Sequence, residues 1–426
     1  MLTYRIVGPP FTANILLPIP VLSTLVTQTQ GRFTVLDSWR GVCAMIVVVY
    51  HFTAKSHLLF LPFFRNGWIF VDFFFVLSGF VITHAYQRHL QSLKELLSFA
   101  IRRFGRIWPL HVAILVPFLI TELLKLLLTA KGFTADHAPF TGEMSITGLI
   151  ANIFLVQSMG VLPGVSWNVP SWSISVEYWT YIVFGITVLA AARTDRPRFW
   201  NALLLTGIFL MSLVFLIVYA KTLETIATFG FFRCLLGFIG GHFAYQLWRR
   251  LPALRGATAA EVMTVILVTL FAVYLANGPF AFLAPIVFGA AVVVFANERG
   301  ALSRLLRGRF FVMLGALSYS IYMTHWFLHD SFRKILNIAE QKTGIVFSVP
   351  MQLTVSRRLV TTKIVVWGGP FFSDLLLVVF LALVIGVSFL TFRFIEKPGQ
   401  RMFGRLARRV LPPSERSAAV ADPKPL

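Results

Sequence analysis

Charged side chains are scarce in this chain of 426 residues: they make up 13% of it, whereas a soluble domain carries roughly a quarter. Cysteine is scarcer still. Only Cys43 and Cys234 occur, each within an apolar run, so we expect reduced packing residues and no disulfide framework. Acidic residues number 17 against 38 lysines and arginines. These shortages exclude an ordinary soluble domain.

Long apolar runs are what the sequence has instead. Hydrophobic residues make up 57% of the chain, and its 43 Phe and 10 Trp suit lipid-facing and interfacial positions. Runs near the length of a bilayer core, about 20 residues, recur and predict an all-α polytopic membrane protein. A run at 146–158 is too short for a span and predicts a re-entrant or interfacial helix. The ten expected transmembrane helices are 36–56, 68–86, 107–129, 174–191, 202–220, 226–247, 259–276, 279–296, 311–330 and 371–392.

The net charge of +21 does not indicate nucleic-acid binding, because the basic residues cluster between apolar runs and leave no soluble domain to bind DNA. Such clusters are typical of cytoplasmic loops that face an anionic leaflet. With 146–158 left out of the count, the basic loops fall on one side, which predicts ten spans with both termini cytoplasmic. The connection 331–370 is expected outside although it holds six basic residues.

Three regions follow from this layout. Residues 1–30 are apolar but interrupted by Pro18 and Pro20, and we expect an interfacial N-terminal extension, unless the true start lies further in. Residues 31–400 form the transmembrane domain. Residues 401–426 are expected to be a basic, partly disordered cytoplasmic tail.

Two polar residues, whose burial in a bilayer costs free energy, lie in the first expected span. Arg40 and His51 are eleven residues apart, which is three helical turns, so they share a face across a rise of about 16 Å. We place Arg40 near the cytoplasmic mouth and His51 in the outer half. Asp72 lies about one turn into the second span, at a depth similar to that of His51. A carboxylate among phenylalanines needs a partner, and we expect it to orient the His51 imidazole.

Other titratable residues fall at the same two depths. Glu177, Arg233 and His325 each belong to a different expected span and lie in its outer half. Arg103 and Arg106 are one turn apart at the inner entry of the third span. Together with Arg40 they form a cationic inner mouth suited to a phosphate-bearing ligand from the cytosol.

Simpler interpretations of these residues stay open. The inner arginines are also explained by topology alone, Arg40 by a snorkelling anchor, and His325 by a satisfied core histidine. Two functional classes follow from the residues. A transporter would use the intramembrane acids and histidines as a proton relay. An enzyme would use His51 with Asp72 as a general base, supplied by a cytosolic phosphorylated donor.

Six motifs, in order, resemble the acyltransferase family 3 of integral-membrane O-acyltransferases over roughly residues 34–400. The matching residues are Leu36, Asp37, Arg40, Gly41 and His51 of the opening motif; Asp72 followed by FFVLSGF (74–80); Arg103 and Arg106; WSISVE (172–177) with Ser173 and Glu177; SYSIYMTHW (318–326) with His325; and FIEKP (394–398).

The resemblance implies an enzyme that transfers an acetyl or other short acyl group from acetyl-CoA, or succinyl-CoA, without a metal. The implied acceptor is a hydroxyl of a cell-surface glycan, such as exopolysaccharide, lipopolysaccharide or a lipid-linked oligosaccharide. It also implies a multi-pass protein of the bacterial inner membrane, in contact with lipids and with glycan-assembly machinery. The alternative is a transporter that exports an acyl group or acylated glycan without forming the ester.

The same resemblance suggests roles for the site residues. Arg40, Arg103 and Arg106 would bind the donor's phosphates. His51, oriented by Asp72, would deprotonate the acceptor hydroxyl or carry the acyl group itself. Glu177 would assist catalysis, with substrate or transition-state support from Ser173, Arg233 and His325; Arg233 would stabilise charge on the carbonyl oxygen.

Overall fold

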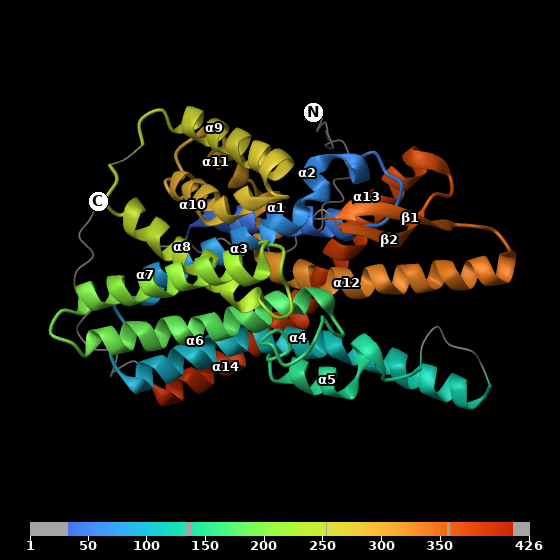
Figure 1. Cartoon of the computed structure of the whole chain (residues 1–426), viewed down its shortest axis with the longest axis horizontal. Coiled ribbons are helices and arrows are strands. Elements are labelled where there is room, and N and C mark those ends of the chain that lie inside the picture. The colour runs from blue at the N-terminus through green and yellow to red at the C-terminus, as the bar shows by residue number, and fades with distance from the viewer. Residues whose placement is uncertain (1–32, 133–137, 253, 356–357, 412–426) are drawn as a thin grey trace, which may run out of the picture. The chain divides into compact units, whose positions relative to one another are not determined.

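Long helices make up almost all of the fold, which Figure 1 shows as a computed structural model. The structure describes residues 33–132, 138–252, 254–355 and 358–411, so the extension expected at 1–30 lies outside the described residues. The main elements are α1 (Thr34–His51), α2 (Pro62–Arg65), α3 (Phe70–Tyr86), α4 (Leu93–Ala130), α5 (Ile146–Ile153), α6 (Trp172–Ala192), α7 (Pro197–Phe215), α8 (Gly230–Trp248), α9 (Ala257–Leu270), α10 (Ala284–Phe295), α11 (Ala301–Leu306), α12 (Arg309–Thr343), β1 (Ser348–Val355), β2 (Arg358–Val365), α13 (Gly369–Thr391) and α14 (Lys397–Val410).

Seven helices in the described part of the chain are long and apolar enough to cross a membrane. Each overlaps one of the ten expected spans. The other three expected spans correspond to α1, α8 and a shorter apolar helix at Pro279–Phe295. The expectation of an all-α polytopic membrane protein is therefore confirmed, while the number of crossings and the side of each terminus stay predictions.

Helix α1 packs along α12, and glycines let the two backbones approach closely. A Cβ on Gly41 would collide with the backbone at Leu314, and one on Gly315 would collide with the carbonyl of Asp37. Gly41 meets Leu314 in the first halves of both helices, and His51 meets His325 further along, so the helices run in parallel and the last turn of α1 lies beside the middle of α12. We call the two ends of this bundle the Arg40 end and the His51 end.

Helices α3 and α8 are joined in the same way. A Cβ on Gly79 would collide with the carbonyl of Phe238, and one on Gly241 would collide with the carbonyl of Val76. Small residues of this kind allow the close helix contacts that are typical of membrane proteins. The pairing fixes which polar side chains of α3 and α8 meet further along, toward the His51 end.

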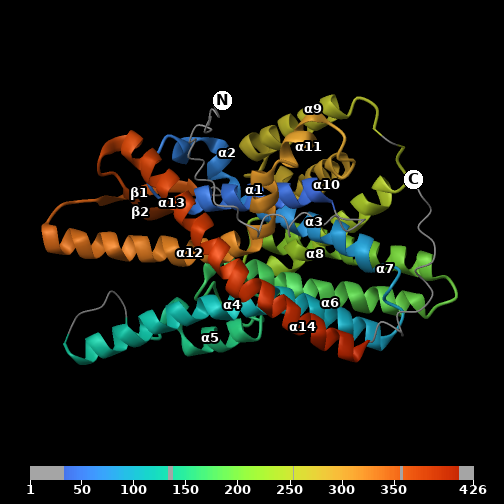
Figure 2. The same ribbon diagram turned by 180° about the vertical axis from the view of Figure 1, so that it is seen from behind.

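Helix α14 runs back along the first half of α4, as both views show (Figures 1 and 2). Gly399 lies against Pro109, Gly105 lies against the Phe403 ring, and Ser98 Oγ donates to a backbone carbonyl near the end of α14. The two helices are therefore antiparallel. The domain edge expected at residue 400 falls inside α14, and the tail beyond 411 lies outside the described residues.

The segment 331–370 differs most from the expected loop. Helix α12 continues to Thr343, and β1 and β2 then form an antiparallel hairpin. TTKIVV, an apolar run at 361–366, lies at the end of β2 and just after it. Val365 N donates to Thr53 O at 3.1 Å, and Lys55 N donates to Val365 O at 2.8 Å. The hairpin is thus attached to the chain just after His51, because the backbone there offers unpaired donors and acceptors.

Helix α5 corresponds to the short run at 146–158. It has eight residues, whereas a bilayer crossing needs about 20, so it cannot span. Its position in or on the membrane stays a prediction.

Candidate active site

His51 and His325 form a pair at the His51 end of the bundle. His51 is the last residue of α1, and His325 lies in the middle of α12 and is buried. His325 Nε2 lies 3.2 Å from His51 Nδ1, and the ring of Trp326 packs against His51 with centroids 5.3 Å apart. The structure thus brings together two of the residues that the sequence placed at a similar depth.

Backbone carbonyls fix the tautomers of both rings. Val47 O lies 2.9 Å from His51 Nδ1, and Ile321 O lies 3.2 Å from His325 Nδ1. A carbonyl oxygen only accepts, so each Nδ1 carries the hydrogen and each Nε2 carries a lone pair. His325 Nε2 then accepts from His51, while His51 Nε2 has no hydrogen-bond partner among the described residues. This nitrogen is available to a ligand as a base.

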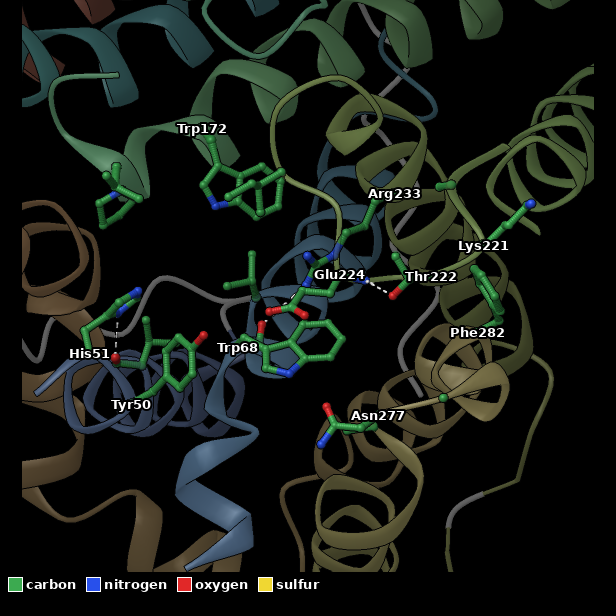
Figure 3. A pocket seen from close by; sticks show the side chains of 18 of the residues that line it. Tyr50, His51, Trp68, Trp172, Lys221, Thr222, Glu224, Arg233, Asn277 and Phe282 are labelled. Carbon is green, nitrogen blue, oxygen red and sulfur yellow. Dashed lines mark hydrogen bonds between the residues drawn. The ribbon is translucent and has the colours of Figure 1, made fainter. Parts of the chain in front are cut away.

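A cavity of about 910 Å³ lies next to His51. Figure 3 shows His51 and Tyr50 on one side of it, with Lys221 and Phe282 on the opposite side. Helices α1, α3, α6, α8 and α12 line it together with the segments that connect helices, and its walls are rich in aromatic rings with a few charged groups among them. These side chains include Tyr50, Trp68, Trp172, Lys221, Glu224, Arg233, Phe282 and Tyr322. Such a mixture is typical of a small-molecule site, in which apolar walls bind and a few polar groups orient.

Asp72 does not pair with His51, which corrects the expectation from the sequence. Its carboxylate accepts from Arg233 twice, from Nε at 3.0 Å and from NH2 at 2.6 Å, and both side chains are 1% exposed. The reason is the close contact of α3 with α8, which places the guanidinium of one helix on the carboxylate of the other. The role expected for Asp72 in orienting His51 has no geometric support.

Arg233 is also enclosed by aromatic rings. Its guanidinium lies 5.0 Å from the Trp68 ring and 5.2 Å from the Trp172 ring, and its NH2 donates to Trp68 O at 3.3 Å. Two carboxylate oxygens and two rings already hold this cation. A role in stabilising charge on the substrate would compete with these contacts, so the geometry favours a structural role.

Ser173 and Glu177 lie one turn apart on α6 but have different partners. Ser173 Oγ is 2.9 Å from the hydroxyl of Tyr322, which lines the cavity. Glu177 Oε1 accepts from Ser78 Oγ at 2.5 Å and from the Tyr181 hydroxyl at 2.6 Å. Ser173 therefore positions a residue of the cavity lining. Glu177 is not part of that lining, and its hydrogen bond with Ser78 links α6 to α3.

The three arginines of the expected inner mouth are already engaged. Arg40 Nε donates to Ser318 Oγ at 2.8 Å, and its NH2 lies 3.4 Å from Asp37 Oδ1. The Arg103 guanidinium stacks over the Tyr86 ring at 5.3 Å. Arg40 and Arg106 both lie within electrostatic range of the buried carboxylate of Glu396. The structure thus brings Arg40 and Arg106 together around an acid.

Sequence reasoning missed several of these residues as members of the site. Tyr322 and Glu396 both lie in motifs that the sequence displays, SYSIYMTHW and FIEKP, and could have been found there. Glu224 and Lys221 lie in the connection between α7 and α8, which carries no recognisable pattern. In the described part of the chain, no group of three His, Cys, Asp or Glu side chains is placed to hold a metal ion.

Comparison with known proteins supports one family. Residues 33–393 match the family model described as an acyltransferase domain. The acyltransferase MdmB of Streptomyces mycarofaciens is 32% identical over 136 residues, which is 32% of each chain. Protein 2 in the picA locus of Rhizobium radiobacter is 39% identical over 82 residues, 19% of this chain and 41% of that one. The chain thus matches less than half the length of either relative, and no solved structure matches it.

The match to the family model covers most of the chain, includes the helices that carry His51 and His325, and agrees with the multi-pass helical fold. The chain therefore belongs to the acyltransferase 3 family.

Proposed function

We propose that this protein transfers an acetyl or other short acyl group from acyl-CoA to a hydroxyl of a cell-surface glycan. Exopolysaccharide, lipopolysaccharide and lipid-linked oligosaccharide are the acceptors we expect, and the bacterial inner membrane is the expected location. The observation that carries the proposal is His51: its Nε2 carries a lone pair beside a cavity of about 910 Å³.

His51 acts as the general base in this proposal. The acceptor oxygen attacks the thioester carbonyl while His51 Nε2 takes the hydroxyl proton, so a C–O bond forms as the C–S bond breaks. The proton then passes from Nε2 to the leaving thiolate. His325 Nε2 supports this cycle, because it accepts from His51 Nδ1 and stabilises the imidazolium that forms. The same lone pair would also serve if His51 carried the acyl group itself.

The shape and chemistry of the cavity support a carbohydrate acceptor. Sugar rings present C–H faces that stack on aromatic side chains, and their hydroxyls bind charged and amide groups. Trp68, Trp172 and Tyr322 supply rings, while Glu224 and Asn277 supply polar groups on the same lining. A glycan hydroxyl held among them would face His51.

Acyl transfer by the purified protein in lipid nanodiscs tests the proposal directly. With labelled acetyl-CoA and an oligosaccharide acceptor, we expect ester formation by the wild type and a loss of about 10²–10⁴-fold in His51→Ala. Mass spectrometry of the protein after rapid denaturation distinguishes a base from an acyl carrier, since only the carrier gains the mass of an acyl group.

His84→Ala is the matched control, because His84 is exposed and its ring contacts Tyr245 away from the cavity. This variant should transfer acyl groups at the wild-type rate. Near-normal transfer by a folded His51→Ala protein would overturn the proposal. The same protein in sealed proteoliposomes tests the transporter, since movement of label across the bilayer without ester formation would favour it.

A further inference from the structure

The arginines expected to bind the donor are poorly placed to bind three phosphate groups. Arg40 pairs with Asp37, Arg106 lies among the carboxylates of Glu396, Asp37 and Glu177, and Arg103 stacks on an aromatic ring. A cation that already faces acids attracts a phosphate less strongly, since the acids repel it. The phosphates of the donor therefore need other positive groups.

Such groups lie in a groove between α4 and α14, with a volume of about 500 Å³. Five cations line it: Arg102 from α4, and Lys397, Arg401, Arg405 and Arg408 from α14. The four on α14 follow at intervals of four, four and three residues, so they form one stripe along the helix. No acidic residue lines the groove.

Three of these charges, those of Arg401, Arg405 and Arg408, are not explained by ion pairing. Within the described residues, none of Arg401, Arg405 and Arg408 makes an ion pair. Like charges three or four residues apart repel each other along a helix, so the stripe opposes helix formation. Helix α14 is stabilised instead by its contact with α4, which involves Gly399, Phe403 and Ala407. A stripe that costs stability is expected where it binds an anionic ligand.

Most of the stripe lies on a different flank of α14 from two exposed apolar side chains. At about 100° per residue, Leu406 lies about 140–160° around α14 from Arg401 and Arg408, and Met402 lies about 100–120° from them. Met402 is 57% exposed and Leu406 is 44% exposed, which suits lipid chains on that flank. The basic residues therefore point toward the groove that Arg102 of α4 also lines, which is open to a ligand from solution.

The groove connects to the site through Gln400, which lines it. Gln400 Nε2 donates to Glu396 Oε1 at 3.0 Å, and Glu396 Oε2 accepts from Ser320 Oγ at 2.7 Å. Ser320 lies five residues before His325 on α12, which is an axial rise of about 7.5 Å. A ligand held in the groove thus lies next to the polar groups that lead along α12 to the His51–His325 pair.

We propose that the α4–α14 groove binds the diphosphate and ribose phosphate of the acyl-CoA donor. The inference rests on the proposed function, because it takes acyl-CoA as the donor. It assigns the anchoring of phosphate to Arg102, Lys397, Arg401, Arg405 and Arg408. Arg40 and Arg106 then form an internal network with Glu396 and leave the anchoring to the groove.

Binding of unacylated CoA to the protein in neutral-lipid nanodiscs tests the inference without requiring acyl transfer. Arg405→Gln and the double variant Arg401→Gln/Arg405→Gln should weaken CoA binding by about tenfold and more than tenfold, since each loses a charge-assisted contact. Arg409→Gln is the matched control: it removes the same charge from the same helix, outside the groove, and should bind CoA like the wild type.

Two further comparisons separate the possible ligands. Wild-type protein should bind CoA more tightly than dephospho-CoA, and the double variant should lose this preference. Wild-type CoA affinity in both groove variants would overturn the proposal. So would a loss of binding to anionic-lipid vesicles with CoA affinity intact, because the groove would then hold lipid headgroups. If CoA binding depends on the groove but no ester forms, the proposed function fails and the groove stands.

Discussion

Two pairs of titratable residues lie at the His51 end, and they differ in whether they leave a polar atom without a partner. In the pair Asp72–Arg233, both carboxylate oxygens meet the guanidinium, and each side chain is 1% exposed. In the pair His51–His325, one hydrogen is shared by neutral rings, and His51 Nε2 still faces the cavity. Asp72 and Arg233 satisfy each other's hydrogen bonds, whereas the histidine pair leaves His51 Nε2 available to a ligand.

The difference follows from the cost of burying charge. A buried ion must have every lone pair and proton matched, or it loses several kcal/mol of solvation. Arg233 and Asp72 meet this condition and thereby hold α8 against α3. Neutral imidazoles cost less to bury, so the pair of α1 and α12 can leave one nitrogen unpaired beside the cavity. Scaffold and reactive group can thus share one depth in the membrane.

Breaking the charged pair gives the largest effect we expect. Arg233→Met leaves the Asp72 carboxylate buried without its partner, which costs roughly 3–5 kcal/mol of unfolding free energy. The melting temperature and the yield of monodisperse protein in detergent measure this loss. If Asp72 instead served His51 directly, Arg233→Met would fold normally and change only the rate of acyl transfer.

The double variant Asp72→Leu/Arg233→Met is the matched control for that experiment. It removes both charges, so most of the lost stability should return. A double variant as unstable as Arg233→Met would show that the aromatic contacts of Arg233 with Trp68 and Trp172, and not its charge pairing, hold the two helices together.

These pairings mark the limit of what the sequence could predict. Apolar runs indicated the helices, and the position of a residue within its run indicated its depth, so His51, Asp72, Arg233 and His325 were expected at one level. Depth does not give the direction in which a side chain points around its helix. The partners depend on which helices touch, and close contacts such as that of Gly79 with α8 decide this. The pair His51–Asp72 was therefore a reasonable expectation and a wrong one.

The hairpin was missed for another reason. Its strands lie in a chain whose other apolar segments are helices, and a short run such as TTKIVV fits the end of a span as well as a strand. Its position depends on backbone bonds to Thr53 and Lys55, far away in the sequence. By contrast, His51 and His325, which both belong to family motifs and were expected at a similar depth, do lie together, with His325 Nε2 3.2 Å from His51 Nδ1; their roles stay predictions.

Altering the neutral pair should have a smaller effect. His325→Leu removes the acceptor for His51 Nδ1, and Val47 O still holds that hydrogen. The loss of one hydrogen bond, about 0.5–1.5 kcal/mol, should lower the rate of acyl transfer roughly 2–10-fold without unfolding the protein. Single-turnover transfer from labelled acetyl-CoA measures the rate.

His325→Gln tests whether the acceptor atom matters. Its side-chain oxygen can accept where Nε2 did, so this variant should recover much of the rate. Equal losses in His325→Leu and His325→Gln would show that His325 only fills space. A loss as large as that of His51→Ala in both would make the two histidines equal partners in the chemistry.

The smallest effect on acyl transfer is expected from Ser173, which contacts a residue of the cavity lining but is not itself part of the lining. Ser173→Ala removes the contact of Ser173 Oγ with the Tyr322 hydroxyl, which frees a ring that lines the cavity. Acceptor binding should weaken a few-fold, raising KM while kcat stays constant, because one net hydrogen bond is worth about 1 kcal/mol.

Ser175→Ala is the matched control: Ser175 Oγ donates to Leu155 O at 2.7 Å, away from the cavity lining. Both variants should lose similar stability, and only Ser173→Ala should change KM; an equal change in both would assign the effect to α6 packing and not to the position of Tyr322.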